Sequence, residues 1–273
     1  MPIRHTYRPH LYFGLAFLAT FLFWGLGARM SFSEAYGRYY MLVMLLGLMT
    51  PFLISTAMIL GSDDRRLKRR FSQRLFNLRL MRPATFPFLI LVMPIIVLIS
   101  ALLSLLIGEP ITQFQPAAGF SFSSGFIPVL LLILLASLFE ELGWRGYAFD
   151  SLESRFNFFT AALIFGLLWA LWYLPLFFVK GSYQYEIMRQ NPLFALNFLV
   201  SIVPLGILIS WVWAKNRRSI PAAILFHFIV NLSQETLAIS QVTKIIETLV
   251  LTLVVAGLVY SDREFFFGPK IDA

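Results

Sequence analysis

The chain has no cysteine among its 273 residues and few charges, because Asp, Glu, Lys and Arg together make up only 13% of it. The absence of cysteine excludes disulfides, thiol catalysis and thiolate metal sites. The scarcity of charge, beside 59% hydrophobic residues, excludes a soluble globular protein. Apolar runs of about 20 residues recur along the whole length and leave no room for a soluble domain. The sequence therefore predicts an all-α, polytopic integral membrane protein of about eight transmembrane helices that enclose a polar cavity.

We predict one helical membrane domain over residues 1–273, with an even number of spans and both termini on one side. The formal charge of +8 is no sign of nucleic-acid binding, because the basic residues gather at the ends of the apolar segments, mostly on the side of the termini. Such an asymmetry marks the cytoplasmic side. The eight predicted segments are 11–29, 39–61, 84–107, 122–149, 158–179, 193–214, 219–238 and 242–260.

The connection over residues 62–82 carries eight basic residues, with Leu67, Phe71, Leu75 and Leu78 at helical spacing. This pattern predicts an amphipathic helix lying on the cytoplasmic membrane interface. A solvated basic loop is the alternative, and either would attract anionic lipid.

The segment Ala136–Tyr147 places two adjacent glutamates and an arginine inside an apolar run. Charged side chains within a membrane segment are costly and are by default candidates for function. Glu141 and Arg145 are four residues apart, so they can pair on one helix face. Glu140 points about 100° away, has no evident counter-ion, and is suited to proton transfer. The alternative is a structural ion cluster at a helix end.

A second polar pair lies in the segment 219–238, where His227 and Asn231 are four residues apart and share a helix face. The other two histidines, His5 and His10, lie in the N-terminal tail. A buried histidine that bonds a carbonyl is the alternative for His227 alone. Together with Glu140 on another helix, the pair favours a site in which a glutamate is the general base and histidine and asparagine donate to an oxyanion.

Several other catalytic chemistries are excluded by what is missing. No Asp falls within the predicted segments, which excludes an aspartyl dyad, and neither Gly-x-Ser-x-Gly nor His-Glu-x-x-His occurs. We expect no catalytic metal and no cofactor.

These residues resemble the intramembrane CAAX-type proteases, whose motifs are Glu-Glu-x-x-x-Arg, Phe-x-x-x-His before Leu-Pro, and His-x-x-x-Asn/Asp. The stretch from Glu140 to Arg145 matches the first motif, and His227-Phe-Ile-Val-Asn231 matches the third. The resemblance covers about residues 122–235 and is strongest to the Ras-converting type II prenyl endopeptidase. It implies removal of the last three residues of isoprenylated proteins, with a prenylated protein or peptide and membrane lipid as partners.

The second motif departs from the family, because Tyr173 stands where the family has its second histidine, just before Leu174-Pro175. The resemblance gives that histidine a share in activating water, gives His227 and Asn231 the oxyanion, and gives Arg145 the task of holding Glu141. A phenol is a poor base at neutral pH, although it can still form a hydrogen bond. By itself, Tyr173 would be interpreted as an aromatic core or membrane-belt residue.

The favoured hypothesis is an endopeptidase impaired at Tyr173, either by divergence or by a deliberate substitution. We favour the deliberate one, since a long-abandoned site would also have lost Glu140, His227 or Asn231. A second hypothesis is a non-catalytic membrane protein that binds lipidated peptides or a partner helix. A third, a proton-coupled transporter, is less favoured because the chain shows poor internal symmetry and its polar groups gather toward one side.

Overall fold

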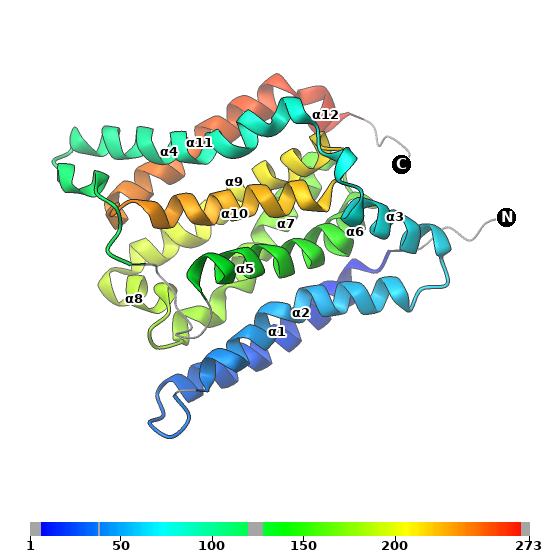
Figure 1. Ribbon diagram of the computed structural model, residues 1–273, viewed down its shortest axis with the longest axis horizontal. Coiled ribbons are helices and arrows are strands. Elements are labelled where there is room, and N and C mark those ends of the chain that lie inside the picture. The colour runs from blue at the N-terminus through cyan, green and yellow to red at the C-terminus, as the bar shows by residue number, and fades with distance from the viewer. Residues whose placement is uncertain (1–6, 38, 120–127, 269–273) are drawn as a thin grey trace.

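The computed structural model describes residues 7–37, 39–119 and 128–268, and the ordered elements in these ranges are helices and helical turns (Figure 1). Arg4, Arg38, Lys270 and residues 122–127 of the fourth predicted segment lie outside the described residues. The helices are α1 (Pro9–Ser31), α2 (Tyr40–Leu60), α3 (Arg65–Phe76), α4 (Phe86–Leu105), α5 (Val129–Gly143), α6 (Phe149–Glu153), α7 (Phe158–Trp172), α8 (Tyr183–Gln190), α9 (Pro192–Lys215), α10 (Ile220–Thr236), α11 (Gln241–Ser261) and α12 (Arg263–Phe267).

Within the described ranges, six helical stretches are long and apolar enough to cross a membrane, so the chain is a multi-pass integral membrane protein. They agree with six of the eight predicted segments. The other two form shorter helices, 15 residues in α5 and 17 in α10. The six are Pro9–Ser31, Tyr40–Leu60, Pro83–Leu105, Phe158–Phe178, Pro192–Lys215 and Gln241–Ser261.

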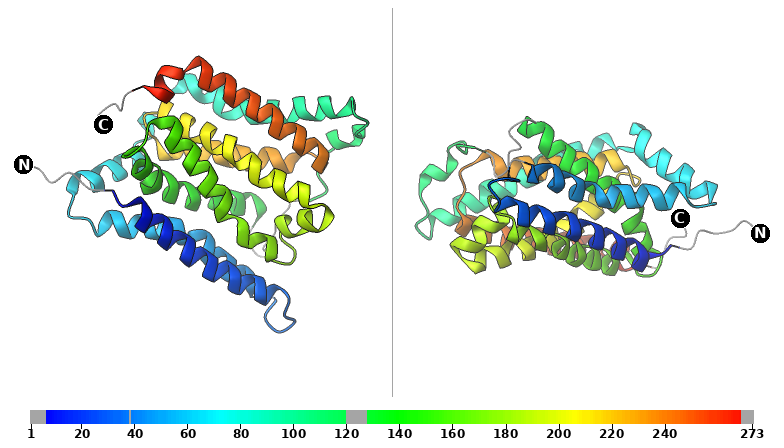
Figure 2. Two further views of the ribbon diagram at one scale, coloured as in Figure 1. Left: turned by 180° about the vertical axis from the view of Figure 1, so that it is seen from behind. Right: turned by 90° about the horizontal axis from the view of Figure 1, so that it is seen from below.

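The long helices lie side by side in two layers (Figures 1 and 2). One layer contains α2, α5, α10 and α4 in spatial order, and the other contains α1, α7, α9 and α11. Helix α10 packs against α4, α5 and α9, and it also touches α3. It is therefore held on several sides, which fixes the polar residues that it carries.

A π-helical turn, Trp144–Ala148, joins α5 to α6, so helical backbone continues from Val129 to Glu153. π turns are rare and often occur at functional sites. All five of its residues are buried. Next to it, an added Cβ on Gly143 would lie 2.6 Å from the carbonyl carbon of Pro51 in α2. Glycine at this position therefore lets α2 lie directly against the segment that carries the two glutamates.

The connection between α2 and α4 folds largely as the amphipathic pattern predicts. Asp64 caps α3 by accepting hydrogen bonds from the amides of Arg66 (2.8 Å) and Leu67 (3.3 Å). Leu67 is buried, and Phe71 packs against the core. Leu78 does not extend this face, because α3 ends at Phe76 and Leu78 is 65% exposed in a separate 3₁₀ turn.

Ion pairs fasten α3 to the end of α6. Arg74 of α3 and Arg218 both form ion pairs with Asp150. The Nη1 atom of Arg218 lies 2.9 Å from Asp150 Oδ1. Arg218 follows α9 and also holds Glu153 through two hydrogen bonds of 2.6 and 2.8 Å. Arg155, just beyond α6, lies 3.4 Å from His10 in α1. These contacts place the end of α6 beside the start of α1 and beside α3.

Candidate active site

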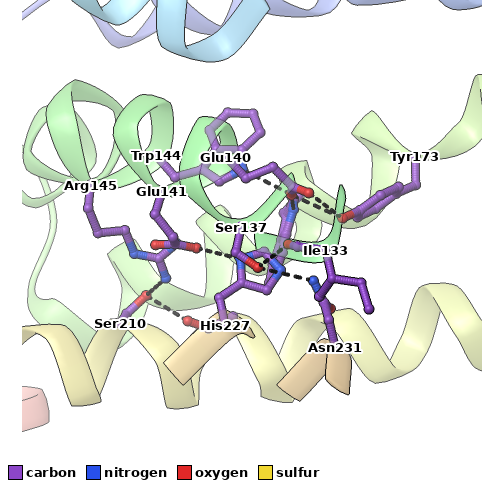
Figure 3. A network of polar contacts seen from close by, with 12 residues as sticks. Ile133, Ser137, Glu140, Glu141, Trp144, Arg145, Tyr173, Ser210, His227 and Asn231 are labelled. Carbon is purple, nitrogen blue, oxygen red and sulfur yellow. Dashed lines mark hydrogen bonds and ion pairs between the residues drawn. The ribbon is translucent and has the colours of Figure 1, made fainter. Parts of the chain in front are cut away.

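Glu140 lies on α5 and is 3% exposed. The hydroxyl of Tyr173 donates to both of its oxygens, at 3.1 and 3.0 Å (Figure 3). The indole Nε1 of Trp169 donates to Oε2 at 2.8 Å, and that of Trp144 approaches the same oxygen at 3.5 Å. All three hydrogen-bond donors are neutral groups, so none of them balances the negative charge of the carboxylate.

Glu141 is fully buried, and Arg145 approaches it to 3.0 Å in the ion pair that the four-residue spacing predicts. His227 Nδ1 lies 3.0 Å from Oε1 of the same carboxylate. Arg145 also donates to Ser210 Oγ on α9 at 3.2 Å, and its guanidinium lies 4.6 Å from the centre of the Phe165 ring. One buried carboxylate thus connects the end of α5 to α10, and through Arg145 to α9.

His227 and Asn231 face α5 from α10 (Figure 3). The imidazole edge meets the Trp169 ring with centroids 5.3 Å apart. Asn231 Nδ2 donates to Ser137 Oγ at 3.3 Å, and Ser137 lies one turn before Glu140 and Glu141 on α5. The four residues of the predicted catalytic set, Glu140, Tyr173, His227 and Asn231, therefore come together from three segments that are distant in sequence.

All four line one cavity of about 400 Å³, whereas Glu141 and Arg145 lie behind its wall. Most of the lining side chains are apolar, among them Met41, Met44 and Leu48 of α2. The cavity is therefore less polar than the sequence suggested. A largely apolar pocket that also carries some polar groups is typical of a site for a ligand with a large apolar part.

Sequence reasoning missed some of the residues that hold this arrangement. Trp169 was not identified from the sequence, although its place four residues before Tyr173 puts both on one helix face. Ser137 could have been found in the same way, since it lies four residues before Glu141. Ser210 gave no signal, because its contact with Arg145 joins positions 65 residues apart.

No three His, Asp or Glu side chains within the described ranges cluster in a way that could hold a metal ion. Glu141 is already held by Arg145 and His227.

Three matches to known proteins bear on this site. The family model described as "Type II CAAX prenyl endopeptidase Rce1-like" matches residues 121–233, which include all four cavity residues named above. "CAAX prenyl protease 2" of Methanococcus maripaludis is 54% identical over 263 residues, covering 96% of this chain and 97% of that protein. "Lysostaphin resistance protein A" of Staphylococcus haemolyticus is 23% identical over 187 residues, covering 68% of this chain and 47% of that protein.

Fold, site and relatives together define a multi-pass membrane endopeptidase, a peptide hydrolase by class. The chain belongs to the Rce1-like family of type II CAAX prenyl endopeptidases. The family resemblance inferred from the motifs is thereby confirmed.

Proposed function

We propose that this chain removes the C-terminal tripeptide of isoprenylated CAAX proteins by glutamate-activated attack of water, and that Tyr173 impairs the reaction. The observation that carries the proposal is the position of Glu140, a buried carboxylate that forms no ion pair among the described residues, on the wall of a mostly apolar cavity. Such a carboxylate can take a proton from water, and the apolar wall suits a prenyl chain.

In the proposed reaction, Glu140 removes a proton from a water molecule as the oxygen attacks the scissile carbonyl carbon. The proton then passes from Glu140 to the leaving amine as the C–N bond breaks, which regenerates the carboxylate. His227 and Asn231 donate hydrogen bonds to the tetrahedral oxyanion. In a doubly protonated imidazole both nitrogens donate, so Nδ1 can hold Glu141 while Nε2 meets the oxyanion.

Tyr173 impairs this sequence in two ways. It supplies no base, and its hydroxyl contacts both oxygens of Glu140, where an attacking water would bind. A carboxylate has about four lone-pair positions. Tyr173, Trp169 and Trp144 together direct hydrogen bonds at most of them, which leaves little room on the carboxylate for water.

We further propose that the chain crosses the membrane eight times, with both termini and the 62–82 connection in the cytoplasm. Helical backbone continues from Val129 to Phe149, the end of the predicted fourth segment, and this stretch of about 20 residues is enough to cross a bilayer even though α5 alone is not. The contact of Arg155 with His10 supports a crossing by this stretch, because it returns the chain to the end at which α1 begins.

The alternative, a non-catalytic protein that binds lipidated peptides or a partner helix, would use the same cavity. Family membership favours the endopeptidase. The alternative also gives no reason for Glu140, which costs free energy to bury and which a simple apolar binding site does not need.

The test is cleavage of a fluorogenic prenylated CAAX peptide by the present chain and its variants, purified in detergent. Tyr173→His should raise turnover by about 10²–10⁴-fold, the usual contribution of a general base. Adding Glu140→Ala should abolish cleavage again, while peptide affinity changes little throughout.

Tyr173→Phe is the matched control, because it removes the hydroxyl from Glu140 but adds no base. It should recover less activity than Tyr173→His. If the present chain cleaves as fast as its histidine variant, Tyr173 does not impair the site and this part of the proposal is wrong.

A further inference from the structure

The end of the cavity away from Glu140 contains a second group of polar side chains, which take no part in the proposed reaction. Lys244 and Glu247 belong to α11, Gln234 to α10 and Tyr183 to α8, and all four line the cavity. The two charged residues are three apart on one helix face, inside a span that contains no other Asp, Glu, Lys or Arg. Charges at such a position are candidates for function.

Among the described residues that line the cavity, Lys244 is the only Lys or Arg. Its ammonium donates to the Tyr183 hydroxyl at 3.1 Å and lies 4.5 Å from the centre of the Tyr183 ring. Among the described residues no carboxylate forms an ion pair with it. Since an ammonium group has three donors, it can still bind an anionic group of a ligand.

Glu247 supplies an acceptor beside this ammonium. It is 5% exposed, and Gln234 Nε2 donates to its Oε1. Its Oε2 is buried and has no hydrogen-bond partner among the described residues. An unsatisfied buried carboxylate oxygen is costly, so an oxygen at the wall of a cavity is well placed to accept from a ligand N–H.

The start of α11 is held firmly, which fixes the position of Lys244. Ser240 caps the helix by accepting from the Thr243 amide at 3.0 Å. The Thr243 hydroxyl donates to Gln113 Oε1 at 2.7 Å, and Thr243 and Gln113 are both buried. Lys244 is therefore on a rigid element and not on a loose loop.

The spacing between Asn231 and Lys244 can be obtained from helix geometry. Helices α10 and α11 are joined by only four residues, 237–240, and run in opposite directions (Figure 1), and the Gln234–Glu247 hydrogen bond brings these two side chains to about the same level. Asn231 is three residues before Gln234, and Lys244 is three residues before Glu247 and thus nearer the connection. Each interval is about 4.5 Å at 1.5 Å per residue, so Lys244 lies roughly 9 Å farther along the cavity than Asn231.

An extended peptide rises about 3.3 Å per residue, so three residues span roughly 10 Å. A substrate whose scissile carbonyl meets Asn231 and Glu140 would therefore place its terminal carboxylate near Lys244 when three residues follow the scissile bond. Glu235 and Glu247 also line the end of the cavity that contains Lys244. Their negative charges disfavour an anion elsewhere at this end, so a terminal carboxylate should bind at the Lys244 ammonium.

We propose that Lys244 and Glu247 form the subsite that recognises the free C-terminus of the substrate peptide. Lys244 binds the terminal α-carboxylate, and Glu247 Oε2 accepts the amide N–H of the last residue. The proposal rests on the proposed endopeptidase function and adds to it a reason why the product is a tripeptide: the distance from the oxyanion groups to the ammonium fits three residues.

The test measures equilibrium binding and so does not depend on turnover by a chain that carries Tyr173. A fluorescent farnesylated peptide is prepared as the free acid and as the C-terminal amide, and both are titrated into the purified full-length protein. The acid should bind at least about tenfold more tightly, as expected for a hydrogen-bonded ion pair. Lys244→Met should remove this preference, and Lys244→Arg should retain most of it.

A third peptide, N-methylated at its last amide, tests Glu247. It should bind the native chain more weakly than the unmethylated acid, and Glu247→Ala should bind the two equally. Equal binding of acid and amide to the native chain would overturn the subsite and leave the proposed function standing. If neither peptide binds, the proposed substrate class is wrong and the subsite is wrong with it.

Discussion

Glu141 shows how much of this site depends on a single side chain that does not reach the cavity. It is completely buried and binds Arg145 and His227, and Arg145 in turn reaches Ser210. If the proposed mechanism holds, Glu141 positions His227 for the oxyanion and takes no part in the chemistry itself. The same carboxylate is then needed for folding and for the orientation of the histidine.

Replacement of this carboxylate should therefore affect stability and turnover together. Glu141→Gln leaves Arg145 buried without its counter-ion, and breaking a buried pair in this way typically costs about 3–5 kcal/mol. We expect a clearly lower midpoint in thermal unfolding in detergent. Ser210→Ala is the matched control, since it removes only a neutral partner of the same arginine and should cost about 1–3 kcal/mol. Similar losses in both variants would contradict the role given to Glu141.

At the residue scale, the sequence predicted what local spacing determines. The Glu141–Arg145 pair and the shared face of His227 and Asn231 follow directly from helical periodicity. The contacts of Ser210 and Gln113 could not be predicted, because they depend on how distant helices pack. Lys244 and Glu247 are a different case: both lie within the predicted segment 242–260, and their charge was a signal, but no function was predicted from it.

At the element scale, the close contact between α2 and the end of α5 determines where the glutamates lie. A Cβ on Gly143 would approach both the carbonyl carbon and the Cβ of Pro51 to 2.6 Å, and the amide nitrogen of Phe52 to 2.9 Å. These are mostly backbone atoms, which cannot rotate away. The positions of the helices were predictable from the apolar runs, whereas this contact and the π turn beside it were not, since neither changes hydrophobic periodicity.

Gly143→Ala should therefore push α5 away from α2. Overpacking of this kind typically costs about 1–3 kcal/mol, and a displaced Glu140 should lower the turnover of the Tyr173→His variant. Gly257→Ala on α11 is the control, because a Cβ added at this position would have no neighbouring residue within 4 Å. That variant should be unchanged or slightly more stable, as alanine is the better helix former. Equal behaviour of the two variants in thermal unfolding would show that the contact does not matter.

The attachment of α3 to α6 should depend on pH. Burial raises the pKa of Asp150, but Arg74 and Arg218 outweigh this effect and hold the pKa below its ordinary value of 3.8. Tyr7 also approaches this carboxylate, at 3.5 Å. A carboxyl with a lowered pKa in the folded state contributes stability that is complete above the ordinary value and is lost as the pH falls below it.

The native chain should thus lose stability as the pH falls below about 4, because Asp150 then takes up a proton. Asp150→Asn should be less stable at neutral pH and should show a smaller decrease in this range. Thermal unfolding in detergent from pH 3 to pH 7 measures both. An unchanged pH profile in the asparagine variant would show that another group is responsible.

At the scale of the whole molecule, the proposed eight crossings can be tested with single cysteines, because the chain has none of its own. Cysteines at the exposed positions Ser72 and Ser261 should be labelled only from the cytoplasmic side, and a cysteine at Glu34 only from the other side. Ser154 is the decisive position. Eight crossings place it with Ser72, whereas six crossings by the long helices alone would place it on the opposite side.

Two groups of residues that line the cavity differ in stiffness. Trp169, Tyr173 and His227 are held by hydrogen bonds and by contacts between rings. Met41 and Met44 of α2 present unbranched side chains that can adopt many rotamers. We therefore expect the two parts of a substrate to be recognised with different strictness. The enzyme should accept lipid chains of different length and branching, and should reject small changes in the peptide beside them.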